Sequence, residues 1–109
     1  MKKVGIIRCQ QTEDLCPGST DFVMAASGKG AFEQTGAAEI IGFVSCGGCP
    51  GKRAVARAAM LKARGAEAVF LASCIKKGTP IGMPCPNYEA MKAAIEKKLE
   101  GLPLIDWTH

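Results

Sequence analysis

The chain has 109 residues and a formal net charge of +4, and 48% of its residues are hydrophobic and 22% charged. These values indicate a single folded domain over residues 1–109 and exclude a disordered chain. Nucleic-acid binding is not favoured, because the charge is modest and only 6% of the residues are aromatic. Arg8 interrupts the first apolar run after only four residues, too early for a signal core or a membrane span, so we expect a cytoplasmic protein without membrane contact.

Apolar runs alternate with helix-forming segments from the N-terminus onward. Residues 4–9 form a continuous apolar run, typical of a strand that is covered on both faces. A loop containing Cys16-Pro17-Gly18 follows, after which Ser19 or Thr20 is expected to cap a helix that runs toward Phe32. Residues 39–45 are the second predicted strand.

The second predicted strand leads into an unusual loop, Cys46-Gly47-Gly48-Cys49-Pro50-Gly51-Lys52. Its glycines permit a sharp turn and close approach to a bound group, and Pro50 suits the first position of a helix. An alanine-rich helix is predicted over residues 54–63, with Gly65 as its stop signal. The start of that helix would direct free N–H groups and a positive dipole end at the loop.

The last part of the chain repeats the alternation. Residues 68–73 are the third predicted strand, and residues 75–86 form a loop without periodicity, long enough to suggest a functional role. Asn87 is expected to cap a helix in which Tyr88, Met91 and Leu99 recur at helical spacing. Residues 104–107 supply a short last strand, and His109 follows it.

This order of elements predicts a three-layer α/β domain. Its four-stranded parallel sheet has the order 2-1-3-4, with helices on both faces. Ligands of such sheets bind at the carboxyl ends of the strands. Cys9, Cys46, Cys74 and His109 each follow a predicted strand, so the topology is expected to gather them at one edge.

Six cysteines require a common explanation in a reducing compartment, where a disulfide scaffold is not expected. One or two of them are explained equally well as small buried hydrophobic residues. All six are not, because they fall at predicted loop positions rather than inside the apolar runs. Metal binding and thiol redox chemistry are the favoured functions.

Distances restrict how a metal would be bound. The sulfurs around one zinc ion lie about 3.8 Å apart, whereas three strand steps cover about 14 Å, so one ion cannot bind every candidate. Two arrangements remain open. One is a single polynuclear cluster, and the other is a pair of centres, near Cys9, Cys16, Cys46 and Cys49 and near Cys74, Cys85 and His109.

Two other functions are consistent with parts of the sequence. In a CxxC thiol-disulfide oxidoreductase, Cys46 would attack a disulfide and Cys49 would resolve it, which leaves four cysteines unused. Phosphate binding by the glycine loop is disfavoured, because a P-loop requires Gly where Cys46 stands and Ser or Thr where Arg53 stands. No general base is identified, so no catalytic residue is assigned.

Several segments together resemble the CGGC-domain family over nearly the whole chain. They are residues 43–52, the pair Cys74-Ile75, the pair Cys85-Pro86 and the closing Thr108-His109. The resemblance implies a metal-binding domain, with zinc as the suggested metal, and it implies these candidate ligands: Cys9, Cys16, Cys46, Cys49, Cys74, Cys85 and His109. With only one histidine in the chain, an all-thiolate centre such as an iron-sulfur cluster is favoured over a mixed zinc site.

Overall fold

The computed structural model describes residues 1–78 and 82–109, and within them four strands form one parallel sheet. The strands are β1 (Lys2–Arg8), β2 (Ala38–Ser45), β3 (Ala68–Leu71) and β4 (Leu104–Ile105). Their order is β2-β1-β3-β4, with every neighbouring pair parallel. The predicted α/β class and strand order are confirmed. Residues 79–81, inside the predicted loop 75–86, lie outside the described residues.

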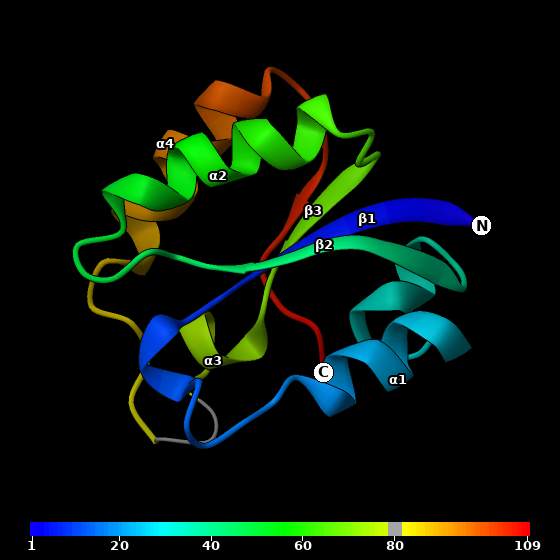
Figure 1. Cartoon of the computed structure of the whole chain (residues 1–109), viewed down its shortest axis with the longest axis horizontal. Coiled ribbons are helices and arrows are strands. Elements are labelled where there is room, and N and C mark those ends of the chain that lie inside the picture. The colour runs from blue at the N-terminus through cyan, green and yellow to red at the C-terminus, as the bar shows by residue number, and fades with distance from the viewer. Residues whose placement is uncertain (79–81) are drawn as a thin grey trace.

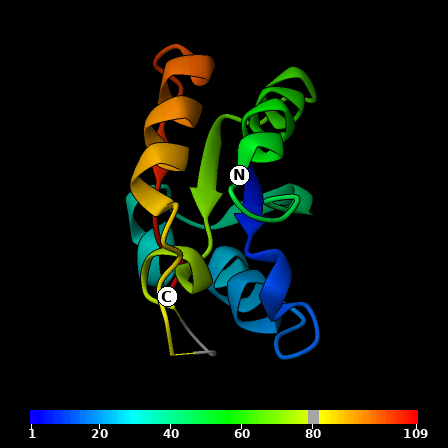
Figure 2. The ribbon, with the colours of Figure 1, turned by 90° about the vertical axis from the view of Figure 1, so that its left-hand side faces the viewer.

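Helices cover both faces of the sheet. The helices α2 (Lys52–Ala63) and α4 (Tyr88–Leu99) lie side by side on one face, and α1 (Ser19–Ser27) lies on the other with the short 3-10 helix η2 (Gly30–Gln34) (Figure 1). Two shorter elements, η1 (Gln10–Thr12) and α3 (Ser73–Lys76), follow β1 and β3. The turned view shows the same three layers (Figure 2). No helix in the described part of the chain is long and apolar enough to span a membrane.

The core lies between these layers. The side chains of Ile6 and Ile7 in β1 and of Phe70 in β3 are fully buried, as expected for central strands covered on both faces. Phe32 of η2 stacks on Phe70 with 4.2 Å between ring centroids. Each buried side chain of this size stabilises the fold by about 1.5–3 kcal/mol, which fixes η2 against the sheet.

Two strand glycines allow α2 to approach the sheet closely. A Cβ added to Gly5 of β1 would lie 2.7 Å from Cδ1 of Leu61, and one added to Gly42 of β2 would also meet that side chain. Leu61 is only 3% exposed. Because glycine has no side chain, Leu61 fills the space above both strands.

The boundaries of the first helix differ from the prediction. The helix α1 ends at Ser27 instead of running toward Phe32, because Gly28 adopts a left-handed conformation with φ +67° and terminates it. Its N-cap is Gly18, not Ser19 or Thr20, and no side chain caps it.

Two further boundaries differ around the carboxyl edge, and a third agrees. The strand β3 ends at Leu71, and Ser73 begins α3 within the predicted strand end. The helix α2 begins at Lys52 with Gly51 as N-cap, so Pro50 precedes the helix and the Cys49–Pro50 peptide is cis. Asn87 is the N-cap of α4, as predicted, but its side chain makes no capping hydrogen bond.

Candidate functional site

The segments that follow the strands are held together at the carboxyl edge of the sheet. The backbone N–H of Cys46 donates to the carbonyl of Arg8 over 2.7 Å, which continues the β1–β2 pairing past the last strand residues. The backbone N–H of Cys9 donates to Sγ of Cys74 over 3.2 Å. The expected gathering of cysteines at this edge is therefore present in the fold.

Four of the cysteines line one cavity of about 250 Å³. No charged residue is among the described residues that line it. We call it the sulfur cavity, and its lining residues are Cys9, Gln11, Cys49, Cys74, Met83, Pro84, Cys85 and Pro86. The cavity thus brings together four thiols and one thioether.

Different segments deliver these sulfurs. Cys9 follows β1, Cys74 lies in α3, Cys49 precedes α2, and Cys85 precedes α4. The backbone N–H of Cys85 donates to the carbonyl of Ile75 over 2.8 Å, which joins its loop to α3. Cys49 is exposed, and its Sγ lies 3.9 Å from Nε2 of Gln11. Tertiary structure, rather than a compact sequence motif, therefore assembles the cavity.

Burial controls the protonation of the inner thiols. Desolvation raises the pKa of Cys9, a backbone hydrogen bond from Gln11 lowers it, and the neighbouring Cys46, Cys74 and Cys85 raise it further. Cys46, Cys74 and Cys85 therefore each lie within electrostatic range of Cys9, whose raised pKa favours the protonated thiol in the absence of a metal.

The Cys74 thiol lies between opposite charges. Its pKa is raised by desolvation and by the carboxylate of Asp21, against hydrogen bonds from Cys9 and Thr12 and the positive charge of Arg8. Since a metal ligand must lose its proton, metal binding at Cys9 and Cys74 would release protons.

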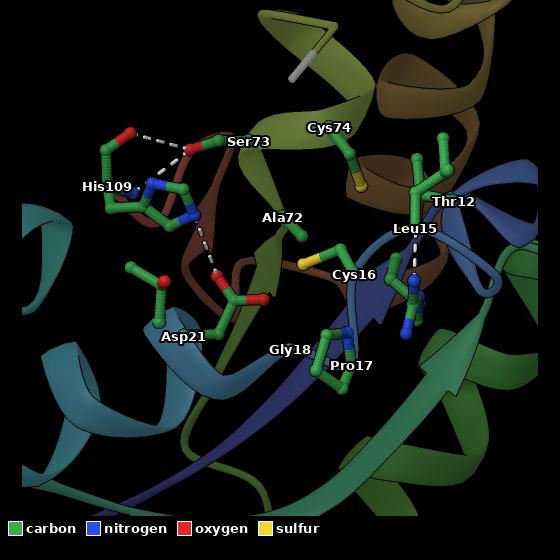
Figure 3. A pocket seen from close by; sticks show the side chains of 12 residues that line it. Thr12, Leu15, Cys16, Pro17, Gly18, Asp21, Ala72, Ser73, Cys74 and His109 are labelled. Carbon is green, nitrogen blue, oxygen red and sulfur yellow. Dashed lines mark hydrogen bonds and ion pairs between the residues drawn. The ribbon is translucent and has the colours of Figure 1, made fainter. Parts of the chain in front are cut away.

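A second cavity of about 230 Å³ shares Cys74 with the first. Its polar lining includes Arg8, Asp21, Ser73 and His109, and Cys16 also lines it. We call it the mixed-charge cavity. Figure 3 shows Cys16 and Asp21 pointing toward one another across it, with His109 next to Asp21.

His109 is held in place through Ser73. The buried Ser73 hydroxyl accepts hydrogen bonds from the backbone N–H groups of Thr108 and His109, both over 3.0 Å. It also lies 2.9 Å from the carbonyl oxygen of His109, to which it donates. These hydrogen bonds fix the backbone of His109 at the cavity.

Six of the seven candidate ligands line one or both of these cavities, in a distribution that the sequence did not indicate. Cys16 and His109 line the mixed-charge cavity, Cys74 lines both, and Cys46, only 7% exposed, is not a lining residue of either. The reason lies in the layers. Cys49 and Cys85 precede α2 and α4 on one face of the sheet, whereas Cys16 precedes α1 on the other.

The thiols surround a space rather than converge on a point. Across residues 1–78 and 82–109, no three side chains from Cys, His, Asp and Glu are placed to hold one metal ion together. The sulfur donors fit a thiophilic metal by their chemistry, but in their present positions they do not form a closed site for a single ion.

Sequence reasoning missed several residues of these cavities. Met83 gave no signal, because a methionine in an irregular loop has no pattern that distinguishes it. Asp21 lies in the first turn of α1, where an acidic residue is already explained by the helix dipole. Ser73 was assigned to the third strand, so its contacts with Thr108 and His109 were not foreseen.

The fold and the site define a small α/β domain with a cysteine-rich carboxyl edge. The chain belongs to the CGGC domain family, whose sequence model matches residues 3–109. It is also 36% identical over 115 residues to an uncharacterized protein of Methanocaldococcus jannaschii, covering 98% of this chain and 86% of that protein. No solved structure matches the chain.

Proposed function

We propose that this protein binds a metal centre through thiolates of the sulfur cavity, with Cys9, Cys49, Cys74 and Cys85 as ligands. The observation that carries the proposal is the convergence of four separate segments on one cavity with sulfur donors and no charged residue in its described lining. Soft sulfur ligands select zinc, copper(I) or iron-sulfur clusters over magnesium and calcium. Membership of the CGGC family and the six cysteines support this assignment.

The spacing of the thiols favours a polynuclear iron-sulfur centre over a single zinc ion. Four sulfurs around one zinc ion must approach to about 3.8 Å from each other, and no described group of three ligands is placed in this way. An iron-sulfur cluster is held by four thiolates distributed over several irons. A cavity of about 250 Å³ surrounded by thiols suits that arrangement.

Three further residues support a thiolate site. Cys46 is close enough to Cys9 to raise its pKa, although it does not line the sulfur cavity. Arg8 lowers the pKa of Cys74 by its positive charge and would offset part of the negative charge of clustered thiolates. Met83 is a weaker, neutral sulfur donor at the same cavity.

Anaerobic purification followed by elemental analysis, acid-labile sulfide determination and visible spectroscopy tests the proposal. We expect iron and sulfide in similar amounts, with charge-transfer absorption that is lost on exposure to a chelator and an oxidant. Stoichiometric zinc in a colourless protein would show that the site holds zinc and not an iron-sulfur cluster. Protein that binds neither metal, even after reconstitution under reducing conditions, would contradict thiolate metal binding altogether.

Variants locate the site. The double substitution Cys9→Ser and Cys85→Ser should remove most of the metal, since it leaves only two thiols at the sulfur cavity. Cys16→Ser is the matched control, because Cys16 lines the mixed-charge cavity instead. Far-ultraviolet circular dichroism of each variant separates metal loss from unfolding. Equal metal loss in both would show that the ligands are assigned to the wrong cavity.

A CxxC thiol-disulfide exchange function is the second candidate, and one observation favours it. Cys49 is exposed and lies just before α2, whereas Cys46 is buried. An attacking thiolate must be accessible, so Cys49 would attack a disulfide and Cys46 would resolve the mixed disulfide, the reverse of the order expected from sequence. A metal-free protein in which Cys46→Ser traps a mixed disulfide at Cys49 would support this function.

A further inference from the structure

Two buried and oppositely charged residues line the mixed-charge cavity without pairing with each other. Arg8 is 8% exposed and Asp21 is 4% exposed, and both line the cavity of about 230 Å³. No salt bridge joins them in the described part of the chain, where Asp21 forms an ion pair only with the ring of His109, and only when that ring is protonated. Buried charges are normally paired, because removing an ion from water is costly.

The guanidinium of Arg8 has unused hydrogen-bonding capacity. Its Nη2 donates to Oγ1 of Thr12 over 2.9 Å, and its central carbon lies 5.7 Å from the centroid of the Phe43 ring. Its Nε–H is buried and has no hydrogen-bond partner among the described residues. A buried donor of this kind indicates a missing acceptor, and an arginine most readily takes a carboxylate or a phosphate.

The carboxylate of Asp21 is similarly incomplete. Its Oδ1 is buried without a hydrogen-bond partner among the described residues, and Nε2 of His109 lies 3.6 Å away, too far for a hydrogen bond. Figure 3 shows the other carboxylate oxygen directed into the cavity, toward Cys16. This side chain therefore offers an acceptor for a cationic donor.

We propose that the mixed-charge cavity binds a small α-amino acid as its zwitterion. The carboxylate of the amino acid would pair with Arg8, and its ammonium group would pair with Asp21. A simple anion would satisfy Arg8 but would be repelled by Asp21, and a simple cation would have the opposite difficulty. Only a ligand that carries both charges complements both the guanidinium and the carboxylate, each of which has a buried atom without a hydrogen-bond partner among the described residues.

The size and the remaining lining of the cavity restrict the side chain of this ligand. Pockets for drug-sized molecules have volumes of roughly 300–1,000 Å³, so a cavity of about 230 Å³ suits a smaller metabolite. Leu15, Pro17 and Ala72 supply apolar surface, and Cys16 and Cys74 supply thiols. These neighbours suit a small uncharged side chain, such as those of alanine and cysteine, better than a charged one.

This inference goes beyond the proposed metal site and does not require it. Arg8 and Asp21 line the mixed-charge cavity, and neither lines the sulfur cavity. Cys74 is the residue that both cavities share. Binding of an amino acid and binding of a metal can therefore fail separately.

Isothermal titration calorimetry of the complete chain with three matched compounds tests the inference. L-alanine carries both charges, propionate lacks the ammonium group, and ethylamine lacks the carboxylate. We expect L-alanine to bind at least tenfold more tightly than either analogue, and L-cysteine to bind at least as tightly as L-alanine. Affinities of propionate or ethylamine equal to that of L-alanine, or no heat with either amino acid at millimolar concentration, would overturn the inference.

Variants assign the two charges. Arg8→Gln and Asp21→Asn should each weaken L-alanine binding at least tenfold. The matched controls are Arg64→Gln and Asp14→Asn, which change exposed residues and should leave the affinity unchanged. Unaltered affinity in folded Arg8→Gln or Asp21→Asn protein would refute the assignment. If either variant fails to fold, the comparison of L-alanine with its analogues on the unmodified chain remains decisive.

A final control separates the inference from the proposed metal centre. The double variant Cys9→Ser and Cys85→Ser should lose metal but retain its affinity for L-alanine. Loss of both together would show that the amino acid binds through the metal, which would refute the inference and leave the metal proposal standing.

Discussion

The sulfur cavity and the mixed-charge cavity share Cys74 and yet differ in chemistry. The described lining of the first has no charged residue, whereas that of the second contains Arg8, Asp21 and His109. The segments that lead into α2 and α4 on one face of the sheet contribute to the first cavity, together with residues that follow β1 and β3. The second is lined largely by the segment that leads into α1 on the other face.

This difference shows that a cysteine after a strand does not by itself specify a site. Cys16 and Cys49 are each followed by proline and each precede a helix, but they line different cavities. The face of the sheet on which the following helix packs determines which neighbours each thiol meets. The helix α3 carries Cys74 and forms the boundary between the two environments.

The largest effect on the comparison is expected from Gly78→Ala, which should disturb the sulfur cavity alone. Gly78 has φ +78°, and an added Cβ would lie 2.5 Å from the backbone nitrogen of Pro84 and would also meet the backbone of Met83. Left-handed strain and this collision should together lower the free energy of unfolding by about 3 kcal/mol. Metal content should fall as well, because the displaced loop carries Cys85.

Denaturant unfolding and elemental analysis measure these two effects. Gly36→Ala is the matched control, because Gly36 has φ +73° but no described atom within 4 Å of the added Cβ. It should lower stability by about 1 kcal/mol through strain alone. A Gly78→Ala protein with the stability and the metal content of this control would remove the loop from the proposed site.

A smaller loss of stability is expected from Ser73→Ala, which should disturb the mixed-charge cavity instead of the sulfur cavity. The substitution removes the acceptor for the N–H groups of Thr108 and His109, and Thr108 is fully buried. Leaving a buried donor without a partner costs about 1–3 kcal/mol. We therefore expect thermal unfolding to shift downward and L-alanine affinity to fall, while metal content stays unchanged.

Ser27→Ala is the matched control for this prediction. Its hydroxyl donates to the carbonyl of Val23 on an exposed helical turn, so its removal should change stability by less than about 0.5 kcal/mol. Metal loss in Ser73→Ala would show that the two cavities do not behave independently.

The smallest effect is expected from Asp106, which lies outside both cavities but supports their shared wall. Burial opposes ionisation of Asp106, but hydrogen bonds from Tyr88, Lys92 and Lys76 outweigh it and lower its pKa to about 2. Lys76 belongs to α3 and Lys92 to α4. The contact between Asp106 and Lys76 therefore holds α3 in position.

Acid unfolding measures this contribution. Because the pKa is lower in the folded than in the unfolded chain, where it is about 3.9, the stabilisation is complete above about pH 4 and is lost as the pH falls toward 2. Lys76 is 47% exposed, so screening limits the effect to about 1 kcal/mol. Asp106→Asn should lack this decline, and identical stability profiles between pH 5 and 2 would exclude the contribution.

The fold was predictable because its main signals are local. The continuous apolar runs of β1 and β3 and the alanine-rich α2 are recognisable by composition and spacing, and the right-handed crossover rule limits how parallel strands connect. The end of α1 was not predictable to the residue, because a glycine is tolerated inside some helices and terminates others. Its effect depends on the left-handed conformation that it adopts here.

The sites were less predictable than the fold. The position of Cys9, Cys46, Cys74 and His109 at one edge follows from strand alternation. Their distribution between two cavities does not, since it depends on contacts across 65 residues of chain, such as that between Cys9 and Cys74. Arg8 and Asp21 were individually explicable as a strand end and a helix start, which concealed their shared position.

The sequence by itself determined the parallel sheet, its strand order and the edge at which the cysteines gather, because hydrophobic spacing and chain connectivity are local properties. Only the tertiary structure decided which sulfurs share the sulfur cavity and that the buried Arg8 and Asp21 line the mixed-charge cavity. Those relations depend on which face each helix covers and on how close side chains from distant segments approach.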